Sequence, residues 1–263
     1  MRSEGAAPAY FERLGETTFC ATQNVQGAWS ADEQHVAPAL GLMTHALERD
    51  HRSRSGVPLQ LSRVAFDILG VMPVGVVELT TRVVRPGRTI ELIEAVLSHD
   101  GRPAVVGRAW FLQTTDTTAL AGSAFPSPPP RDALAPWDNS AVWPGLFVTT
   151  VQTRRRQLEP GGAWAWMRPT VAVLADEPVS PTARLLGMVD IFNGLTVRES
   201  PDQVHFPNVD LTAHLLREPA GDWFAADTTV SFGPGGLGLT HTIVHDEAGP
   251  VGTVSQSLTV RPR

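Results

Sequence analysis

Two short segments decide the fold of this chain: ALGLMT at residues 39–44 and LLGMVD at residues 185–190. They align glycine on glycine at an offset of 146 residues, and the same offset places the pair HD at 99–100 on the pair HD at 245–246. The identities are few, but their common order and nearly constant offset indicate an internal repeat. The sequence therefore predicts two copies of one structural unit, each of an ordinary domain size.

A proline-rich segment separates the two copies. Residues 122–144 include three consecutive prolines at 128–130, and consecutive prolines do not lie inside a helix or a paired strand. We therefore expect an N-terminal domain at residues 1–121, a linker at 122–144 and a C-terminal domain at 145–263.

Each copy shows one apolar helix followed by a run of strands. Apolar residues at spacings of three and four predict a buried helix at residues 38–49. A second helix is expected to be capped by Ser180 or Thr182 and to continue through Ile191. Alternating patterns and turn residues predict strands at 76–84, 89–98, 105–114, 148–156, 163–174, 223–232, 238–245 and 253–260.

This plan favours an α+β fold of the tandem, or double, hotdog type. In a hotdog, an antiparallel sheet wraps around a central helix. Two copies in tandem join their sheets into one long sheet, which buries edges that a single copy would expose. A sandwich or barrel would explain the strands but not an apolar helix at the same place in each copy.

Composition excludes several classes of function. The formal net charge is −6, and all 21 basic residues are arginine, so the chain gives no electrostatic reason to expect a nucleic acid partner. No apolar run is long enough to span a membrane, and no signal peptide is expected at the N-terminus. The single cysteine, Cys20, excludes an internal disulfide and favours a reducing, cytoplasmic location.

Asp190 is the most informative polar residue. It lies at the end of an otherwise apolar helical segment, and burying an ionised carboxylate is costly unless hydrogen bonds compensate. The pattern alone leaves two interpretations open: a solvent-facing or structural aspartate, and a functional one.

Several motifs give the chain a resemblance to a known family. Asp190, Asn208 in FPNVDLT (206–212) and Gln256 in GTVSQ (252–256) occur in that order, and GAWS (27–30) followed by EQHVAPAL (33–40) opens the first copy. In these motifs the chain resembles the double-hotdog acyl-CoA thioesterases of the type II bacterial and peroxisomal group. The resemblance implies that Asp190, Asn208 and Gln256 together hold the attacking water. Asn208 stands where the family has threonine or serine.

The resemblance also implies where substrate binds. His35 is expected to line the acyl thioester site, although Val36 and Ala37 replace the usual glycine pair after it. Thr44 and Gly187 are further expected substrate-binding residues. The repeat places Thr44, Arg63 and Trp110 where the second copy has Asp190, Asn208 and Gln256, so one catalytic set is expected, with the first domain as scaffold and substrate wall. No cofactor or metal is expected, because the histidines lack ligand spacing.

The predicted function is hydrolysis of an acyl thioester, carried by CoA or by an acyl carrier protein, in lipid metabolism. One alternative is a non-hydrolytic acyl-binding or natural-product tailoring protein on the same scaffold. A hotdog dehydratase or hydratase is a further alternative, although the Gly-Asp-x-Asn-Pro-x-His string of those enzymes is missing. A homodimer or higher homo-oligomer is expected, and the seven tryptophans are expected in core and interface positions.

Overall fold

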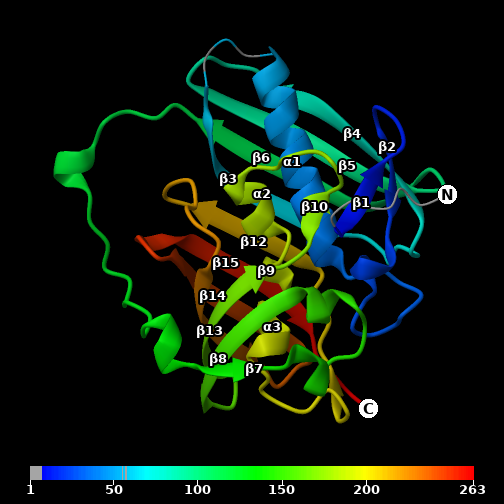
Figure 1. Cartoon of the computed structure of the whole chain (residues 1–263), viewed down its shortest axis with the longest axis vertical. Helices are drawn as coiled ribbons and strands as arrows, with labels where there is room; N and C mark the ends of the chain where they lie inside the picture. Colours follow the sequence, from blue (N-terminus) through cyan, green and yellow to red (C-terminus); the bar gives the residue numbers. More distant parts are fainter. Residues whose placement is uncertain (1–7, 55, 57) are drawn as a thin grey trace.

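A computed structural model describes residues 8–54, 56 and 58–263. Within them, one long sheet curves around helix α1 (Val36–Arg54) and a set of shorter helices (Figure 1). In their order across this sheet, the strands are β10 (Ala172–Leu174), β1 (Ala9–Arg13), β2 (Thr18–Ala21), β4 (Val76–Arg85), β5 (Ile90–His99), β6 (Arg102–Leu112), β3 (Gln60–Ile68), β12 (Asp210–Leu215), β15 (Gly249–Thr259), β14 (Leu237–Asp246), β13 (Phe224–Phe232), β9 (Gly162–Pro169), β8 (Val151–Glu159) and β7 (Ala135–Trp137). The short strands β11 (Val204–His205) and β16 (Arg261–Pro262) pair separately.

The strand order has an approximate two-fold symmetry. Strands β3 and β12 pair antiparallel at the centre, with Ala65 opposite Thr212, and β6, β5 and β4 on one side match β15, β14 and β13 on the other. Ile90 opens β5 and Leu237 opens β14, an offset of 147, one more than the glycine alignment gives. The double-hotdog architecture predicted from the repeat is confirmed.

The second helix differs from the prediction. Helix α2 (Pro181–Leu186) begins at Ser180, whose hydroxyl accepts the Ala183 amide, but it ends at Gly187. A 3-10 turn (Val189–Ile191) and the short helix α3 (Phe192–Leu195) follow. The continuous helix expected through Ile191 is therefore wrong, because Met188, with φ −136°, leaves the helical conformation between α2 and the turn.

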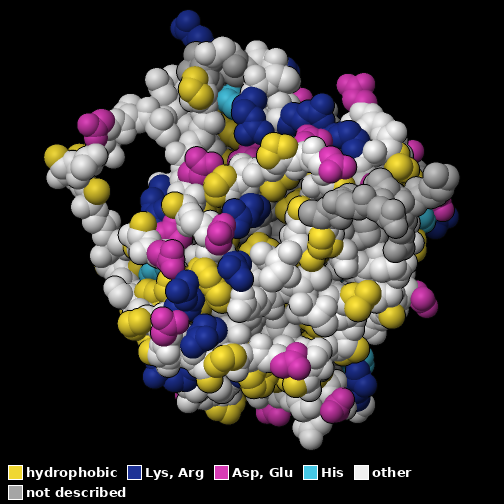
Figure 2. Space-filling model, viewed as in Figure 1, with side chains coloured by type: hydrophobic (Ala, Val, Ile, Leu, Met, Phe, Trp, Pro, Cys, Tyr) yellow, Lys and Arg dark blue, Asp and Glu magenta, His cyan; other side chains and the backbone are white. Residues whose placement is uncertain are grey.

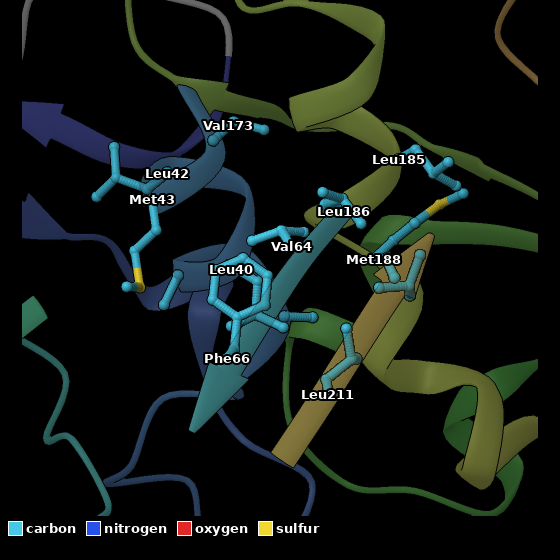
Figure 3. Close-up of a cluster of buried hydrophobic side chains, with 14 of the residues drawn as sticks. Leu40, Leu42, Met43, Val64, Phe66, Val173, Leu185, Leu186, Met188 and Leu211 are labelled. Carbon is cyan, nitrogen blue, oxygen red and sulfur yellow. The ribbon is translucent and has the colours of Figure 1, made fainter. Parts of the chain in front are cut away.

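The two helices cross through their glycines. A Cβ atom added to Gly41 would lie 2.7 Å from Gly187 Cα and 2.9 Å from the Ala183 carbonyl oxygen. Apolar side chains of the helical segments and of the central strands β3 and β12 form one cluster around this crossing (Figure 3), namely Leu40, Val64, Phe66, Leu185, Leu186, Met188 and Leu211. Each of these side chains is fully buried, so the two copies share one core rather than two.

The segment predicted as a linker has two different parts. The chain between β6 and Pro130 arches away from the body (Figure 1). Ala135–Trp137 then forms β7, which pairs with β8, so this part of the predicted linker belongs to the sheet. Pro136 is tolerated because β7 is an edge strand, where one row of amide groups needs no partner.

The expected strand at 163–174 is divided. Strand β9 ends at Pro169, and Ala172–Leu174 forms β10. Strand β10 pairs parallel with β1, with Ala9 opposite Ala172 and Phe11 opposite Leu174. A strand from the second half of the chain therefore forms an edge of the first half's sheet.

The surface agrees with the expectation drawn from composition. Figure 2 shows arginines interspersed with acidic side chains on the face in view, without a large field of one sign. Among the described residues, no helix is long and apolar enough to cross a membrane.

Gly41→Ala should destabilise the protein by about 1–3 kcal/mol, the usual cost of overpacking, because the added methyl group forces α1 and α2 apart. Gly75→Ala is the matched control, since a Cβ atom there meets nothing within 4 Å. Urea unfolding of both variants measures the difference. Equal midpoints for the two would contradict a close glycine crossing.

Candidate active site

Asp190 accepts hydrogen bonds from two amide side chains on one oxygen. It lies in the turn Val189–Ile191 and is only 6% exposed. Asn208 Nδ2 donates to Asp190 Oδ1 at 2.7 Å, and Gln256 Nε2 donates to the same oxygen at 2.8 Å. Three residues distant in sequence thus converge, and Oδ2 receives neither amide.

Burial decides the charge of this carboxyl group. Desolvation raises the pKa of Asp190 from 3.8 to about 6, while the hydrogen bonds from Asn208 and Gln256 lower it. Asp190 is therefore ionised near neutral pH but accepts a proton readily. That combination suits a group that must take and return a proton.

His35 lies beside the free oxygen of Asp190. Its Nδ1 is 3.6 Å from Asp190 Oδ2 and accepts the Ala37 amide of helix α1 at 3.2 Å. Burial lowers the pKa of His35 to about 3, so the ring is neutral at physiological pH and carries its proton on Nε2. Its ring packs against Phe147, with ring centroids 4.3 Å apart.

A cavity of about 280 Å³ opens over Asp190, Asn208 and His35. Both halves of the chain build it: the first contributes residues 27–30, 33–36 and 68–72, and the second contributes Trp143, Val148, Ile191, Asn193, Gly194 and residues 206–208. Leu69 and Val71 are strongly exposed, so its rim is apolar. No arginine lines this cavity among the described residues.

Sequence reasoning missed the aromatic wall of this cavity. Trp29, Trp143 and Phe206 pack edge to face, with ring centroids 5.0–5.8 Å apart. Trp143 donates its indole N–H to the Gly194 carbonyl at 2.9 Å, which fixes it to the end of α3. The tryptophans were expected in core and interface positions. Trp29 lies in the motif GAWS, which could have pointed to the site, whereas no motif surrounds Trp143.

Two expected substrate-binding residues do not line the cavity. Thr44 is fully buried and donates its hydroxyl to the Leu40 carbonyl at 2.8 Å within α1. Gly187 lies at the helix crossing against Gly41. Of the predicted binding residues, the structure brings only His35 to the cavity.

The described residues contain no group of three His, Cys, Asp or Glu side chains placed to hold a metal ion. The polar set around Asp190 instead consists of one carboxylate, two amides and a neutral imidazole. Such a set can orient a water molecule and accept its proton.

Comparison with known proteins identifies the fold and the family. The acyl-CoA thioesterase N-terminal domain matches residues 25–112, and the acyl-CoA thioesterase C-terminal domain matches residues 126–260. No curated protein matches the chain.

Solved structures share the fold at low sequence identity. A conserved hotdog-fold protein of unknown function from Alicyclobacillus acidocaldarius superposes with a TM-score of 0.73 at 14% identity, covering 95% of each chain. The acyl-CoA thioesterase II of Mycobacterium marinum gives a TM-score of 0.66 at 17% identity, covering 96% of each chain. The tesB protein of Mycobacterium avium subs paratuberculosis gives 0.67 at 17% identity with the same coverage. Because the C-terminal domain match alone spans half of the residues, this chain belongs to the acyl-CoA thioesterase family and is a thioester hydrolase.

Proposed function

We propose that the protein hydrolyses an acyl thioester of CoA or of an acyl carrier protein, using water activated by Asp190. One observation carries the proposal: both amide donors bind Asp190 Oδ1, which leaves Oδ2 available to a water molecule in the cavity. Asp190 is the general base, and Asn208 and Gln256 fix the plane of its carboxylate and position the water.

In the proposed reaction, the Asp190 carboxylate first accepts a proton and later returns it. Asp190 takes a proton from water while the water oxygen bonds to the thioester carbonyl carbon. The tetrahedral intermediate then collapses and the C–S bond breaks. The sulfur takes the proton that Asp190 returns and leaves as a thiol. A pKa of about 6 serves both steps, because the carboxylate is ionised before the attack and is a competent acid after it.

The amino end of α1 is the proposed electrophile. Helix α1 is 19 residues long, and Val36 in its first turn lines the cavity. The first amide groups of a helix have no partner within the helix, and the helix dipole makes this end electropositive. The Ala37 amide already donates to His35 Nδ1, and Pro38 has no N–H, so the Val36 amide is the group proposed to polarise the thioester carbonyl and to stabilise the negative charge that develops on its oxygen.

The first domain supplies the substrate wall in this scheme. His35, Trp29 and the segment 68–72 come from it, whereas Asp190, Asn208 and Gln256 come from the second. Asn208 takes the place of the family hydroxyl, and its amide can donate to Asp190 as a hydroxyl would. A cytoplasmic location and a homo-oligomeric state remain predictions from the sequence.

Asp190→Asn should lower kcat by about a hundredfold or more while raising stability. The folded-state pKa is raised, so the native state loses stability as pH rises from about 4 to 6, and the full penalty of about 3 kcal/mol applies above pH 6. Asparagine removes that penalty and still accepts both amides. Release of free thiol measures hydrolysis, and urea unfolding at pH 4 and pH 7.5 measures stability, with a gain expected only at pH 7.5.

Asp190→Ala is the comparison variant. It also removes the base, and it leaves the buried Gln256 amide without its acceptor, which costs about 1–3 kcal/mol. The half-buried Asn208 amide keeps its hydrogen bond to the Asp210 carbonyl. The Asp190→Ala variant should therefore have a lower free energy of unfolding than the Asp190→Asn variant at pH 7.5. Wild-type rates in both variants would exclude Asp190 as the base.

The pH profile tests the charge state directly. kcat/KM should rise tenfold per pH unit below about pH 6 and level off above it, because only the carboxylate form of Asp190 is active. His35 should add no second limb near neutrality, since its pKa is about 3. Asn208→Ala removes a hydrogen bond that lowers the pKa of Asp190, so its limb should shift to higher pH. A profile without an acid limb between pH 4 and 8 would contradict the assignment.

A further inference from the structure

The two-fold symmetry of the fold generates a counterpart of the Asp190 cavity. That cavity lies where the start of α1, the segment after β3, the segment before β12 and the end of the second helical region meet. The symmetry exchanges these for the start of α2, the segment after β12, the segment before β3 and the end of α1. A second meeting point of the same four kinds of element must therefore exist on the molecule.

A cavity of about 360 Å³ lies at that point. Thr182 comes from the start of α2, Glu218 follows β12, residues 58–61 precede β3, and Glu48, His51 and Arg52 come from the end of α1. Phe111 and Thr114 complete its lining. We refer to it as the counterpart cavity.

The counterpart cavity lacks the hydrolytic set. Thr44 occupies the place that the glycine alignment gives to Asp190, and its hydroxyl is already bonded to the Leu40 carbonyl. Strands β6 and β15 start at Arg102 and Gly249, which are 147 residues apart. This offset places Ala109 at the position of Gln256, which corrects the Trp110 expected from the glycine alignment. The residues proposed to hold water at Asp190 therefore have no equivalents here.

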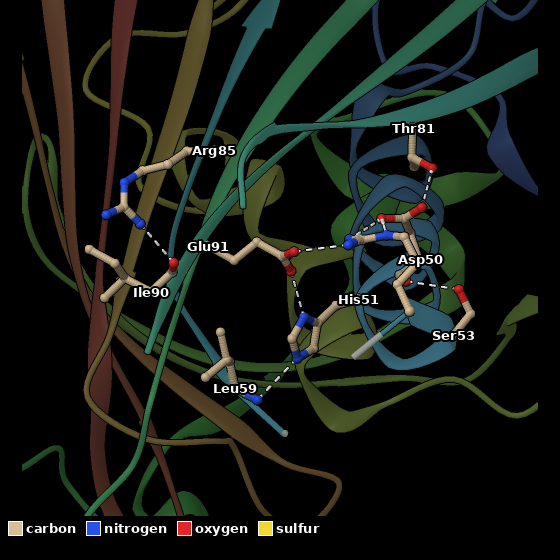
Figure 4. Close-up of polar contacts among 9 residues, drawn as sticks. Asp50, His51, Ser53, Leu59, Thr81, Arg85, Ile90 and Glu91 are labelled. Atoms are coloured by element: carbon tan, nitrogen blue, oxygen red, sulfur yellow. Dashed lines mark hydrogen bonds and ion pairs between the residues drawn. The ribbon is translucent and has the colours of Figure 1, made fainter. Parts of the chain in front are cut away.

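One wall of the counterpart cavity is held rigidly. The Leu59 amide donates to His51 Nε2 at 3.0 Å, and His51 Nδ1 lies 2.6 Å from Glu91 Oε2 (Figure 4). Arg54 donates to the other Glu91 oxygen at 2.9 Å. Because both ring nitrogens of His51 are engaged, this histidine ties the end of α1 to the start of β3 and is not available as a base.

Glu48 is a polar residue of the counterpart cavity that takes no part in the hydrogen bonds among His51, Glu91 and Arg54. Its side chain is buried, with the whole residue 8% exposed, and Ser180 donates its hydroxyl to Oε2 at 2.5 Å. No described residue donates to Oε1. Around it lie the apolar side chains Leu59, Leu61 and Phe111, and the exposed Arg52 supplies a cation that the Asp190 cavity does not have.

We propose that the counterpart cavity is a second, non-hydrolytic binding site for an acyl-pantetheine thioester. Its apolar wall receives the acyl group, Glu48 Oε1 accepts an amide N–H of the pantetheine arm, and Arg52 pairs with a phosphate. The ligand class rests on the proposed function, because the same arrangement of elements forms both cavities. The site itself rests only on the geometry of the counterpart cavity.

Titration calorimetry of the full chain with S-alkyl-CoA thioethers of four, eight and twelve carbons tests this. Thioethers cannot be hydrolysed, so the test does not depend on which residue is catalytic. Two equivalents should bind per chain, and only one should coincide with inhibition of thioester hydrolysis. S-alkyl-pantetheine, run in parallel, separates recognition of the pantetheine arm from recognition of the CoA nucleotide.

Thr114→Trp should weaken the second binding event about tenfold or more and leave kcat/KM within about twofold, because it fills the counterpart cavity from its exposed edge. Thr117→Trp, an exposed neighbour outside the lining, is the matched control and should retain both events. Glu48→Gln, which keeps an acceptor for the Ser180 hydroxyl, should weaken only the second event.

Three results would overturn the proposal: one equivalent bound at every chain length, a second event that Thr114→Trp and Glu48→Gln leave unchanged, or residual hydrolysis in Asp190→Ala that Glu48→Gln abolishes. The last would make the counterpart cavity catalytic. Two binding events without any hydrolysis would instead refute the proposed function and leave the second site in place.

Discussion

The contact between Gly41 and Gly187 is the constraint on which the rest of the structure depends. Without side chains at these two positions, the helical segments of the two halves approach until backbone meets backbone. That approach allows one curved sheet to enclose both, with a shared apolar core between the helices and the central strands. It also brings the start of α1 to the turn that carries Asp190, so the cavity exists only where the halves meet.

Much of the architecture could be predicted from the sequence, because the same short sequence patterns occur once in each copy of the repeat. The glycine alignment, the alternating strands and the Asp-Gly turn at residues 100–101 each reflect a short-range rule, and the hairpins lie where those rules predict. The break after Gly187 was not predicted, because the helical spacing of apolar residues continues through it to Ile191. The pairing of Pro136 at the sheet edge likewise depends on a strand that follows it in the chain.

The residues of the candidate site also fall into two groups: those that the sequence predicted and those that only the tertiary fold brings together. The resemblance named Asp190, Asn208 and Gln256, and the structure places both amides in hydrogen-bond contact with Asp190, although the catalytic roles of the three residues remain predictions. Trp143 and the segment 68–72 were missed because neither carries a motif, and only the tertiary fold brings them to the cavity. The buried position that raises the pKa of Asp190 also makes the native state less stable than an uncharged side chain would allow, a trade of stability for function.

The parallel pair formed by β10 and β1 has a consequence for separating the two halves. Strand β10 belongs to the second half of the chain but completes the sheet of the first. A fragment that ended before the second half would therefore expose the backbone amide and carbonyl groups of β1 that now pair with β10. The first half is thus a sheet with one edge strand supplied from outside it.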